Sequence, residues 1–188
     1  MHDRLGQMLC RWRHRVAARS IKGRVLDIGC GTNQLIKSHG DGIGVDVHGW
    51  DGVDIIVDNT ADLPFEDRGF DTVTIIAALN HIPNRKEVLL ETNRLLRDGG
   101  RIVLTMIPPR LSTIWHFLRR PWDADQHERG MKDGEVYGMT VREVDDLLGE
   151  AGFENIHHER FMLGVNCLTT AEKPLIGKTA PSEDRVAA

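Results

Sequence analysis

The chain has 188 residues, and its 40% hydrophobic and 28% charged residues predict one soluble globular domain of ordinary size. The formal net charge is −4 and no run of about 18 apolar residues occurs, so we expect neither a strongly basic nucleic-acid-binding domain nor a transmembrane helix. The 3 scattered cysteines and an N-terminus without an apolar signal core predict a reduced, cytoplasmic protein.

The chain begins with a predicted basic helix. Residues 1–24 carry seven Lys or Arg and one acidic residue, which gives this segment a charge of +6 and leaves −10 on the remainder. Apolar residues recur there at helical spacing, at Leu5, Met8, Leu9, Trp12 and Val16. We interpret residues 1–22 either as a lid that packs over a ligand site or as a helix that lies in a membrane interface.

The following elements alternate between strand and helix. We expect strands at residues 25–28, 43–47, 54–57, 70–76 and 101–106, and helices at 33–38, at 88–96 before the Asp98–Gly100 turn, and at 141–151 between a Thr140 N-cap and Gly152. Residues 107–140 look irregular apart from one helix near 112–118. Residues 154–160 and 165–171 form a strand pair, and 174–188 form a disordered tail. The pattern predicts an α/β domain over 23–173, with a mostly parallel sheet covered by helices on both faces.

A glycine loop follows the first predicted strand. Residues 29–31, Gly-Cys-Gly, fall at the switch point of such a sheet, where ligands bind. The P-loop signature is absent, and a dinucleotide fingerprint would need glycine where Gln34 stands. Asp27 would repel a pyrophosphate and attract a cation, and Asp46 at the end of the second strand can accept hydrogen bonds from both ribose hydroxyls. These residues favour a nucleoside that carries positive charge.

Four segments together resemble a known family in their order and spacing: VLDIGCGTNQ, IGVDVHG, DNTADLPFEDRGFDTVTIIAALNHIPN and LLRDGGRIVLTM. They resemble the class I S-adenosylmethionine-dependent methyltransferases, and within them the branch that acts on small molecules and lipids. The likeness covers residues 24–106 and again 138–156. It implies a Rossmann-like, seven-stranded sheet of order 3-2-1-4-5-7-6 with strand seven antiparallel, S-adenosylmethionine as cofactor, and S-adenosylhomocysteine as product.

The resemblance also implies a set of cofactor-binding residues. In the family pattern the first acidic residue and the loop face the methionine part, Asp46 holds the ribose, and Val47 packs on the adenine. Asp58 with Asn59 would cap the adenine edge, but one extra residue before LPF makes Asp62 a competing candidate. The full matching set is Asp27, Gly29, Cys30, Gly31, Asp46, Val47, Asp58, Asn59, Asp62, Ile76 and Ala77.

The chain departs from the family pattern after the fourth strand. Many relatives carry Glu where this chain has Ala77 or Asn80, so a silent cofactor-binding regulatory or scaffolding protein stays an alternative. His81 keeps the family's histidine. We interpret it either as a general base near the methyl acceptor or as a structural histidine under the Pro83 turn. Alignment of the reacting atoms alone can also suffice, without a base.

The acceptor side falls in residues 107–140, which form part of the lid in this branch. The candidates there are Trp115, His116, Trp122, His127 and Tyr137. WDADQHERG has no metal-ligand spacing, so we expect a solvated loop and no metal. Because Trp and Arg recur in IWHFLRRPW and in the N-terminal helix, we expect an amine or hydroxyl of a lipid headgroup as acceptor, with a sugar or glycan intermediate as the alternative, and a peripheral membrane contact. A nucleic-acid acceptor is disfavoured, because the body is acidic.

Overall fold

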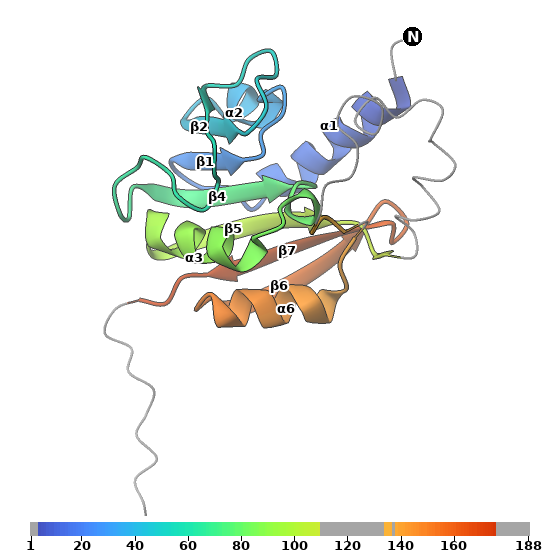
Figure 1. Ribbon diagram of the computed structural model, residues 1–188. Helices are drawn as coiled ribbons and strands as arrows, with labels where there is room; N and C mark the ends of the chain where they lie inside the picture. Colours follow the sequence, from blue (N-terminus) through green and yellow to red (C-terminus); the bar gives the residue numbers. More distant parts are fainter. Residues whose placement is uncertain (1–3, 110–133, 137, 176–188) are drawn as a thin grey trace, which may run out of the picture.

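The computed structural model describes residues 4–109, 134–136 and 138–175, which build one sheet with helices on both faces (Figure 1). The described part of the chain holds a seven-stranded sheet of order β3-β2-β1-β4-β5-β7-β6, in which β7 runs antiparallel to both neighbours. The predicted order is therefore confirmed. The strands are β1 Val25–Ile28, β2 Gly42–Asp46, β3 Ile55–Ile56, β4 Phe70–Ile76, β5 Leu96–Met106, β6 Glu154–Phe161 and β7 Asn166–Glu172.

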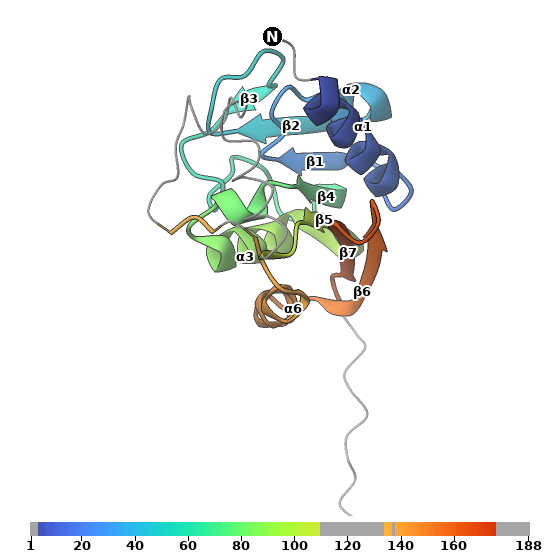
Figure 2. The ribbon, with the colours of Figure 1, turned by 90° about the vertical axis from the view of Figure 1, so that its right-hand side faces the viewer.

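The helices form one layer on each side of the sheet. Figure 2 shows α1 and α2 on one face, and α3 and α6 on the other. They are α1 Arg4–Ala18, α2 Gln34–His39, α3 Arg85–Leu95 and α6 Val141–Glu150, with a 3₁₀ turn η1 at Leu79–His81. The helix expected near residues 112–118 and most of the expected tail lie outside the described residues. No helix in the described ranges is long and apolar enough to cross a bilayer.

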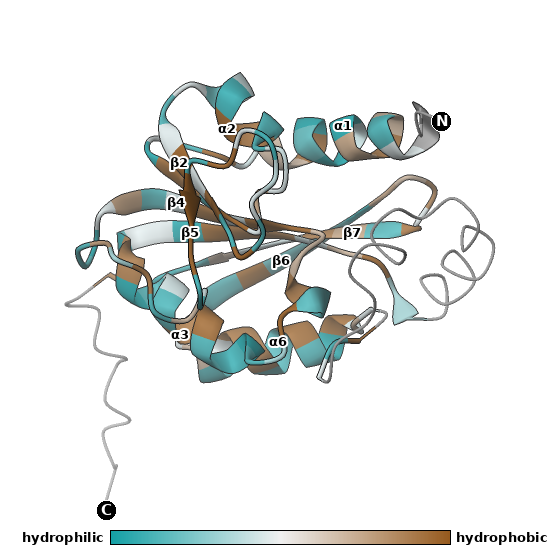
Figure 3. Cartoon of the chain, turned by 45° about the horizontal axis from the view of Figure 1, so that its top comes forward, coloured by the Kyte–Doolittle hydropathy of each residue, from teal (hydrophilic) through white to brown (hydrophobic). Residues whose placement is uncertain are grey.

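The core follows the hydrophobic pattern of the strands. All four residues of β1 are buried, as expected for a central parallel strand that helices cover on both faces. Figure 3 shows hydrophobic residues prevailing in β4, whereas α3 and α6 alternate between hydrophobic and hydrophilic residues. On one face, Val16 and Ala17 of α1 pack against Val103 of β5 and Leu168 of β7, and Leu9 is partly buried there. The predicted helix is present, but Met8 and Trp12 of its predicted apolar stripe are exposed. On the other face α3 and α6 pack on the main core.

The predicted start of α6 is confirmed by its capping residues. The Thr140 hydroxyl accepts a hydrogen bond from the Glu143 backbone N–H at 3.2 Å, and the Glu143 carboxylate accepts one from the Thr140 backbone N–H at 2.7 Å. This reciprocal capping box satisfies two N–H groups that a helix start leaves without intrahelical partners. At the other end Gly152 follows the helix with φ of 82°, so the chain turns there into β6.

The fifth strand begins earlier than predicted. The sequence indicates a turn at Asp98–Gly100, but β5 already starts at Leu96 and carries these residues as an irregular, bulged stretch. Leu96 pairs with Phe70 and Arg101 pairs with Thr72, so the extra residues loop out between two paired positions. Lys173 holds the bulge, because its Nζ donates to the Asn93 and Leu96 carbonyls at 2.7 and 2.8 Å. Tertiary hydrogen bonds thus convert a local turn signal into strand.

Smaller differences concern the elements around the glycine loop. α2 begins at Gln34 and not at Asn33, because Asn33 takes a left-handed conformation with φ of 58°. β2 ends at Asp46, one residue before the expected end, and β3 has only two residues. Val47 therefore leaves the sheet and stands exposed beside it.

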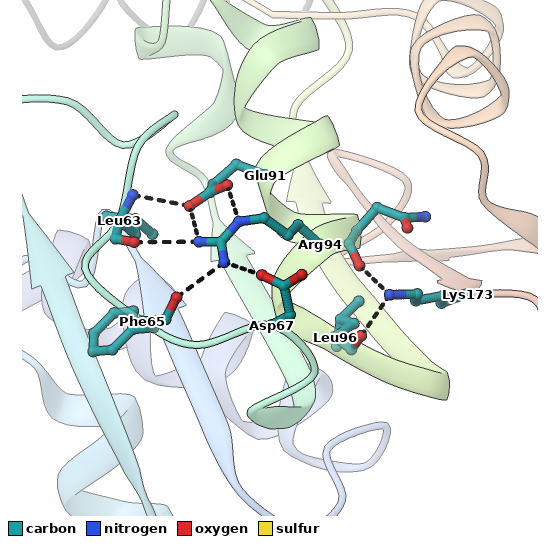
Figure 4. A network of polar contacts seen from close by, with 8 residues as sticks. Leu63, Phe65, Asp67, Glu91, Arg94, Leu96 and Lys173 are labelled. Atoms are coloured by element: carbon teal, nitrogen blue, oxygen red, sulfur yellow. Dashed lines mark hydrogen bonds and ion pairs between the residues drawn. The ribbon is translucent and has the colours of Figure 1, made fainter.

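A polar network anchors the LPF segment to α3 (Figure 4). Glu91 accepts the Leu63 backbone N–H at 2.9 Å and a hydrogen bond from Arg94 at 2.6 Å. Arg94 in turn donates to the Leu63 and Phe65 carbonyls at 3.2 and 2.9 Å and forms an ion pair with Asp67. The loop between β3 and β4 is therefore fixed at its second half, and this fixes the position from which residues 58–60 extend.

Candidate functional site

A cavity of about 550 Å³ lies at the carboxyl ends of β1, β2 and β4. Described residues that line it include the glycine loop, the end of β2, the start of the β3–β4 link, the residues after β4, and three residues of α1. In Figure 1 α1 runs past the carboxyl ends of β1 and β4, the edge at which a doubly wound sheet binds its ligands. The cavity is therefore the candidate site.

The glycine loop needs glycine at two positions for different reasons. Gly29 has φ of 72°, and a Cβ there would stand 2.6 Å from the Cβ of Ala78. Gly31 has φ of 54°, and a Cβ there would meet no atom of the described residues within 4 Å, so its backbone faces open space at the cavity. A left-handed conformation disfavours other residues at both positions. The loop thus brings bare backbone to the cavity wall.

Asp46 ties this loop to the end of β2. One carboxylate oxygen accepts the Gly31 backbone N–H at 2.9 Å, and the other accepts the His48 backbone N–H at 2.9 Å. The side chain is buried yet lines the cavity. Each carboxylate oxygen has a second lone pair, so Asp46 can still accept two hydrogen bonds from a ligand diol. The ribose-binding role of Asp46 stays a prediction.

Asp27 lies deeper, at the floor of the cavity. It is 2% exposed, and the Thr74 hydroxyl donates to it at 2.6 Å. Burial raises the pKa of Asp27 to about 7, although the hydrogen bond from Thr74 acts in the opposite direction, and the Asp46 charge adds to the increase. A cation in the cavity would favour the ionised form, whereas a phosphate would oppose it. The floor of the cavity therefore suits a cationic group.

Cys30 lines the same wall of the cavity, and its thiol is unreactive. Burial and the charges of Asp27, Asp46 and Asp54 raise the pKa of its thiol to about 12. The thiol therefore stays protonated at neutral pH and is a poor nucleophile. Its contribution to the site is shape.

A set of hydrogen bonds behind the glycine loop, which we call the lock, is not predicted by the sequence motifs. Asn33 donates to the Asp54 carboxylate at 2.8 Å and to the Gly52 carbonyl at 3.0 Å, and Asp54 also accepts the Gly44 backbone N–H at 2.8 Å. Gly44 leaves room for Asn33, because a Cβ there would lie 2.1 Å from its side-chain oxygen. The sequence signal was Asn33, two residues after Gly31, because asparagine tolerates the left-handed region better than most residues. The lock holds the loop against the β2–β3 link.

The remaining cofactor-side candidates divide into two groups. Val47, Asp58, Asn59, Ile76 and Ala77 all line the cavity. Asp62 is exposed and is not among the lining residues, so of the two competing aspartates the structure brings only Asp58 to the site.

His81 lines the cavity and pairs with an acidic residue that the sequence did not indicate. Its Nδ1 lies 3.3 Å from Glu135, whose side chain is buried. Arg85 holds the two segments together, because it donates to the Leu79 and Asn80 carbonyls of η1 and to the Gly134 carbonyl at 2.7 Å. A carboxylate on one ring nitrogen orients the imidazole and leaves the other nitrogen for a proton transfer. Glu135 carried no signal of its own, because 54 residues of sequence separate it from His81.

The helix α1 supplies a cation to the opposite wall. Cys10, Arg13 and His14 line the cavity. The Nε of Arg13 is buried, and no hydrogen-bond partner reaches it among the described residues. Burial lowers the pKa of Arg13, so its guanidinium would gain from an anionic partner. The sequence predicted that α1 could act as a lid over the site but did not single out Arg13.

Other predicted residues cannot be placed. The acceptor-side candidates Trp115, His116, Trp122, His127 and Tyr137 lie outside the described residues. Within the described ranges, no group of three or more His, Cys, Asp or Glu side chains is arranged to hold a metal ion.

Comparison with known proteins identifies the family to which this fold and site belong. Residues 1–158 match the family described as methyltransferase domain. A ubiquinone/menaquinone biosynthesis C-methyltransferase from Desulfotalea psychrophila is 30% identical over 187 residues, which cover 82% of this chain and 76% of that protein. An uncharacterised protein from Methanocaldococcus jannaschii is 32% identical over 143 residues and covers 72% of this chain, which spans 66% of it.

A further relative matches over a shorter stretch, and solved structures share the fold. A demethylmenaquinone methyltransferase from Lactiplantibacillus plantarum is 29% identical over 119 residues, and this chain spans 50% of it. Among solved structures, a protein described as a SAM-dependent methyltransferase, possible histamine N-methyltransferase, from Thermotoga maritima has a TM-score of 0.63 at 20% identity and covers 90% of this chain and 97% of its own. At that identity the structural likeness shows the fold alone.

Proposed function

The chain belongs to the class I S-adenosylmethionine-dependent methyltransferases, and we propose that it transfers the methyl group of S-adenosylmethionine to a small, lipid-like acceptor that carries a hydroxyl or amine. The family and its cofactor are as the sequence resemblance predicted. The observation that carries the proposal is the charge pattern of the cavity. Two buried carboxylates lie on its floor, and its wall holds a buried guanidinium nitrogen that has no hydrogen-bond partner in the described part of the chain.

The residues present fit this cofactor group by group. Asp46 has lone pairs left for the two ribose hydroxyls, Asp27 favours a cation, and the buried Nε of Arg13 is open to an anionic ligand, since no described residue pairs with it. A ligand with a ribose, an ammonium, a sulfonium and a carboxylate satisfies all three side chains. When bound, S-adenosylmethionine supplies an electrophilic methyl group on a sulfonium sulfur.

The chain's own residues then have two tasks. The glycine loop and Asp46 fix the position of the nucleoside end, and positioning is a large part of the rate enhancement in a transfer between two bound partners. In this proposal His81, which contacts Glu135 through Nδ1, takes the proton that the acceptor hydroxyl or amine loses. The proton ends on the ring nitrogen of His81 that does not face Glu135.

The lipid-like character of the acceptor rests on two supports. The basic helix α1 with its exposed Trp12 borders the cavity, and the named relatives carry quinone-pathway names. Those names favour a second candidate reaction, methylation of a ring carbon on a prenylated quinol, in which His81 would accept the proton of a ring hydroxyl.

Calorimetry and product analysis test the proposal in two stages. Titration with S-adenosylmethionine should show binding that Arg13→Gln weakens and Lys22→Gln, a surface control, does not. Incubation with methyl-labelled cofactor and a lipid extract should then give a labelled, organic-soluble product whose N-, O- or C-methyl group distinguishes the candidate acceptors. Absence of cofactor binding would contradict the proposed function, and label that enters only water-soluble sugars would contradict the acceptor class.

A further inference from the structure

The outward side of α1 is both apolar and basic. Met8 is 54% exposed and Trp12 45% exposed, and they stand four residues apart, on one side of the helix. Arg11 and Arg15 are exposed beside them, and neither forms an ion pair with an acidic group among the described residues. We call Met8, Arg11, Trp12 and Arg15 the α1 outer face.

The exposure of this face is not a consequence of poor packing. The inward side of α1 is packed, because Val16 and Ala17 are 3% and 0% exposed in the core and Arg13 lines the cofactor cavity. A helix that buries one side in the core does not require apolar residues on its other side. The exposed Met8 and Trp12 therefore suggest that a further molecule or surface covers them.

The charge around the face extends onto α2. A groove of about 870 Å³ separates the two helices, and its basic and acidic lining residues are Arg11, His14, Arg15, Lys37, His39 and Asp51. The basic groups outnumber the single aspartate among the described lining residues. The groove therefore has a positive potential on a chain whose net charge is −4.

We propose that the α1 outer face and the basic groove dock the protein on an anionic phospholipid surface. Tryptophan and arginine side by side suit the headgroup region, where the indole ring lies at the boundary of the acyl chains and guanidinium groups bind lipid phosphates. The charge complementarity favours a lipid surface with anionic headgroups over a neutral one. Because α1 also borders the cofactor cavity, docking would bring the cavity close to the membrane surface. The proposal goes beyond the proposed function and holds whatever the acceptor is.

Sedimentation of the full chain with vesicles tests the docking surface. We expect binding to vesicles that contain phosphatidylglycerol, weak binding to phosphatidylcholine alone, and a loss of binding as salt rises. The Arg11→Gln/Arg15→Gln variant should partition about 30-fold more weakly at low salt, since each arginine near an anionic surface contributes roughly 1 kcal/mol. The Met8→Ser/Trp12→Ser variant should lose the residual binding that survives at high salt.

A matched variant on the opposite face of the sheet provides the control. Leu90→Ser/Arg142→Gln removes an exposed apolar residue of α3 and an exposed arginine of α6, and it should sediment like the wild type. All variants should bind S-adenosylmethionine with unchanged affinity, which shows that they are folded and keeps this test separate from that of the proposed function.

Three outcomes would overturn the docking proposal. The first is no sedimentation with phosphatidylglycerol vesicles at low salt. The second is an equal loss in the control variant. The third is salt-sensitive binding to single-stranded RNA without binding to vesicles, which would identify the basic face as a nucleic-acid surface.

Discussion

Cofactor affinity should depend on pH through Asp27. Burial raises the pKa of this carboxyl to about 7, so without ligand about nine in ten Asp27 side chains carry a proton at pH 6 and about one in four at pH 7.5. If only the ionised form attracts the cationic methionine end, the apparent affinity for S-adenosylmethionine should rise about eight-fold between pH 6 and pH 7.5, or by roughly 1 kcal/mol. The rise should end near pH 8, where the α-amino group of the ligand loses its own proton.

Calorimetry at several pH values measures this dependence directly. Titrations in buffers of different ionisation enthalpy should show about one proton released per cofactor bound at pH 6. The Asp27→Asn variant keeps the shape of the side chain and an acceptor for the Thr74 hydroxyl, so it should bind more weakly at pH 7.5 but with a flat profile. An affinity that does not change between pH 6 and pH 7.5, or an unchanged slope in Asp27→Asn, would refute the reasoning.

The same carboxyl predicts a pH dependence of stability without cofactor. Because its folded pKa lies above the value of about 3.9 in the unfolded chain, the native state binds more protons between these values. The free energy of unfolding should therefore fall as the pH rises from about 4 to 7, by at most about 4 kcal/mol from this group. Asp27→Asn should remove that part of the fall in urea titrations, and an identical fall in the variant would assign it to other groups.

Further substitutions test three separate parts of the structure. Asp46→Ala removes the acceptor of two backbone N–H groups and of the ribose, so the dissociation constant of S-adenosylmethionine should rise about 30-fold in calorimetry, whereas Asp62→Ala, outside the cavity, should leave it unchanged. His81→Gln should lower kcat by roughly 10²–10⁴ with unchanged cofactor affinity, and Glu135→Gln should shift the pH profile of kcat; unaltered turnover in both would exclude a base at position 81. Glu91→Ala should lower the free energy of unfolding by about 2 kcal/mol in urea, because it removes the hydrogen bonds of this carboxylate with the Leu63 N–H and the Arg94 guanidinium. Burial raises the pKa of Glu91, but its hydrogen bonds outweigh this and lower it, so the wild type should lose this advantage as the pH falls below about 4.

The predictable parts of the fold are those encoded by neighbouring residues. The strand order followed from the resemblance of consecutive segments, and the start of α6 followed from Thr140 and its position before an apolar stripe. The β5 boundary was wrong because Asp98–Gly100 is a valid turn signal that Lys173, which lies 77 residues beyond Leu96, overrides through hydrogen bonds to residues before the bulge. Local chemistry thus predicts an element wherever no distant side chain competes for its backbone.

In the candidate site, too, only the residues that belong to local motifs could be predicted from the sequence. Its floor could be predicted, because Asp27 lies one residue before the end of β1 and Asp46 ends β2, and these two strands are parallel neighbours in the sheet. Its partners from elsewhere could not, since neither Glu135 nor Arg13 belongs to a motif, and only the packing of their segments brings them to the cavity.

The helical period of α1 separates its arginines into two groups with different surroundings. Arg11, Arg13 and Arg15 look equivalent in the sequence, but steps of about 100° per residue turn Arg13 away from the other two. Arg13 joins the cavity that holds two buried carboxylates, and a ligand that carries both signs of charge could pair with the guanidinium at one end and with the carboxylates at the other. Arg11 and Arg15 remain outside, where an anion must come from another molecule or surface. One basic helix therefore serves two recognition tasks, and single substitutions along it should separate them: Arg13→Gln should weaken the cofactor and spare vesicle binding, whereas Arg11→Gln should do the reverse.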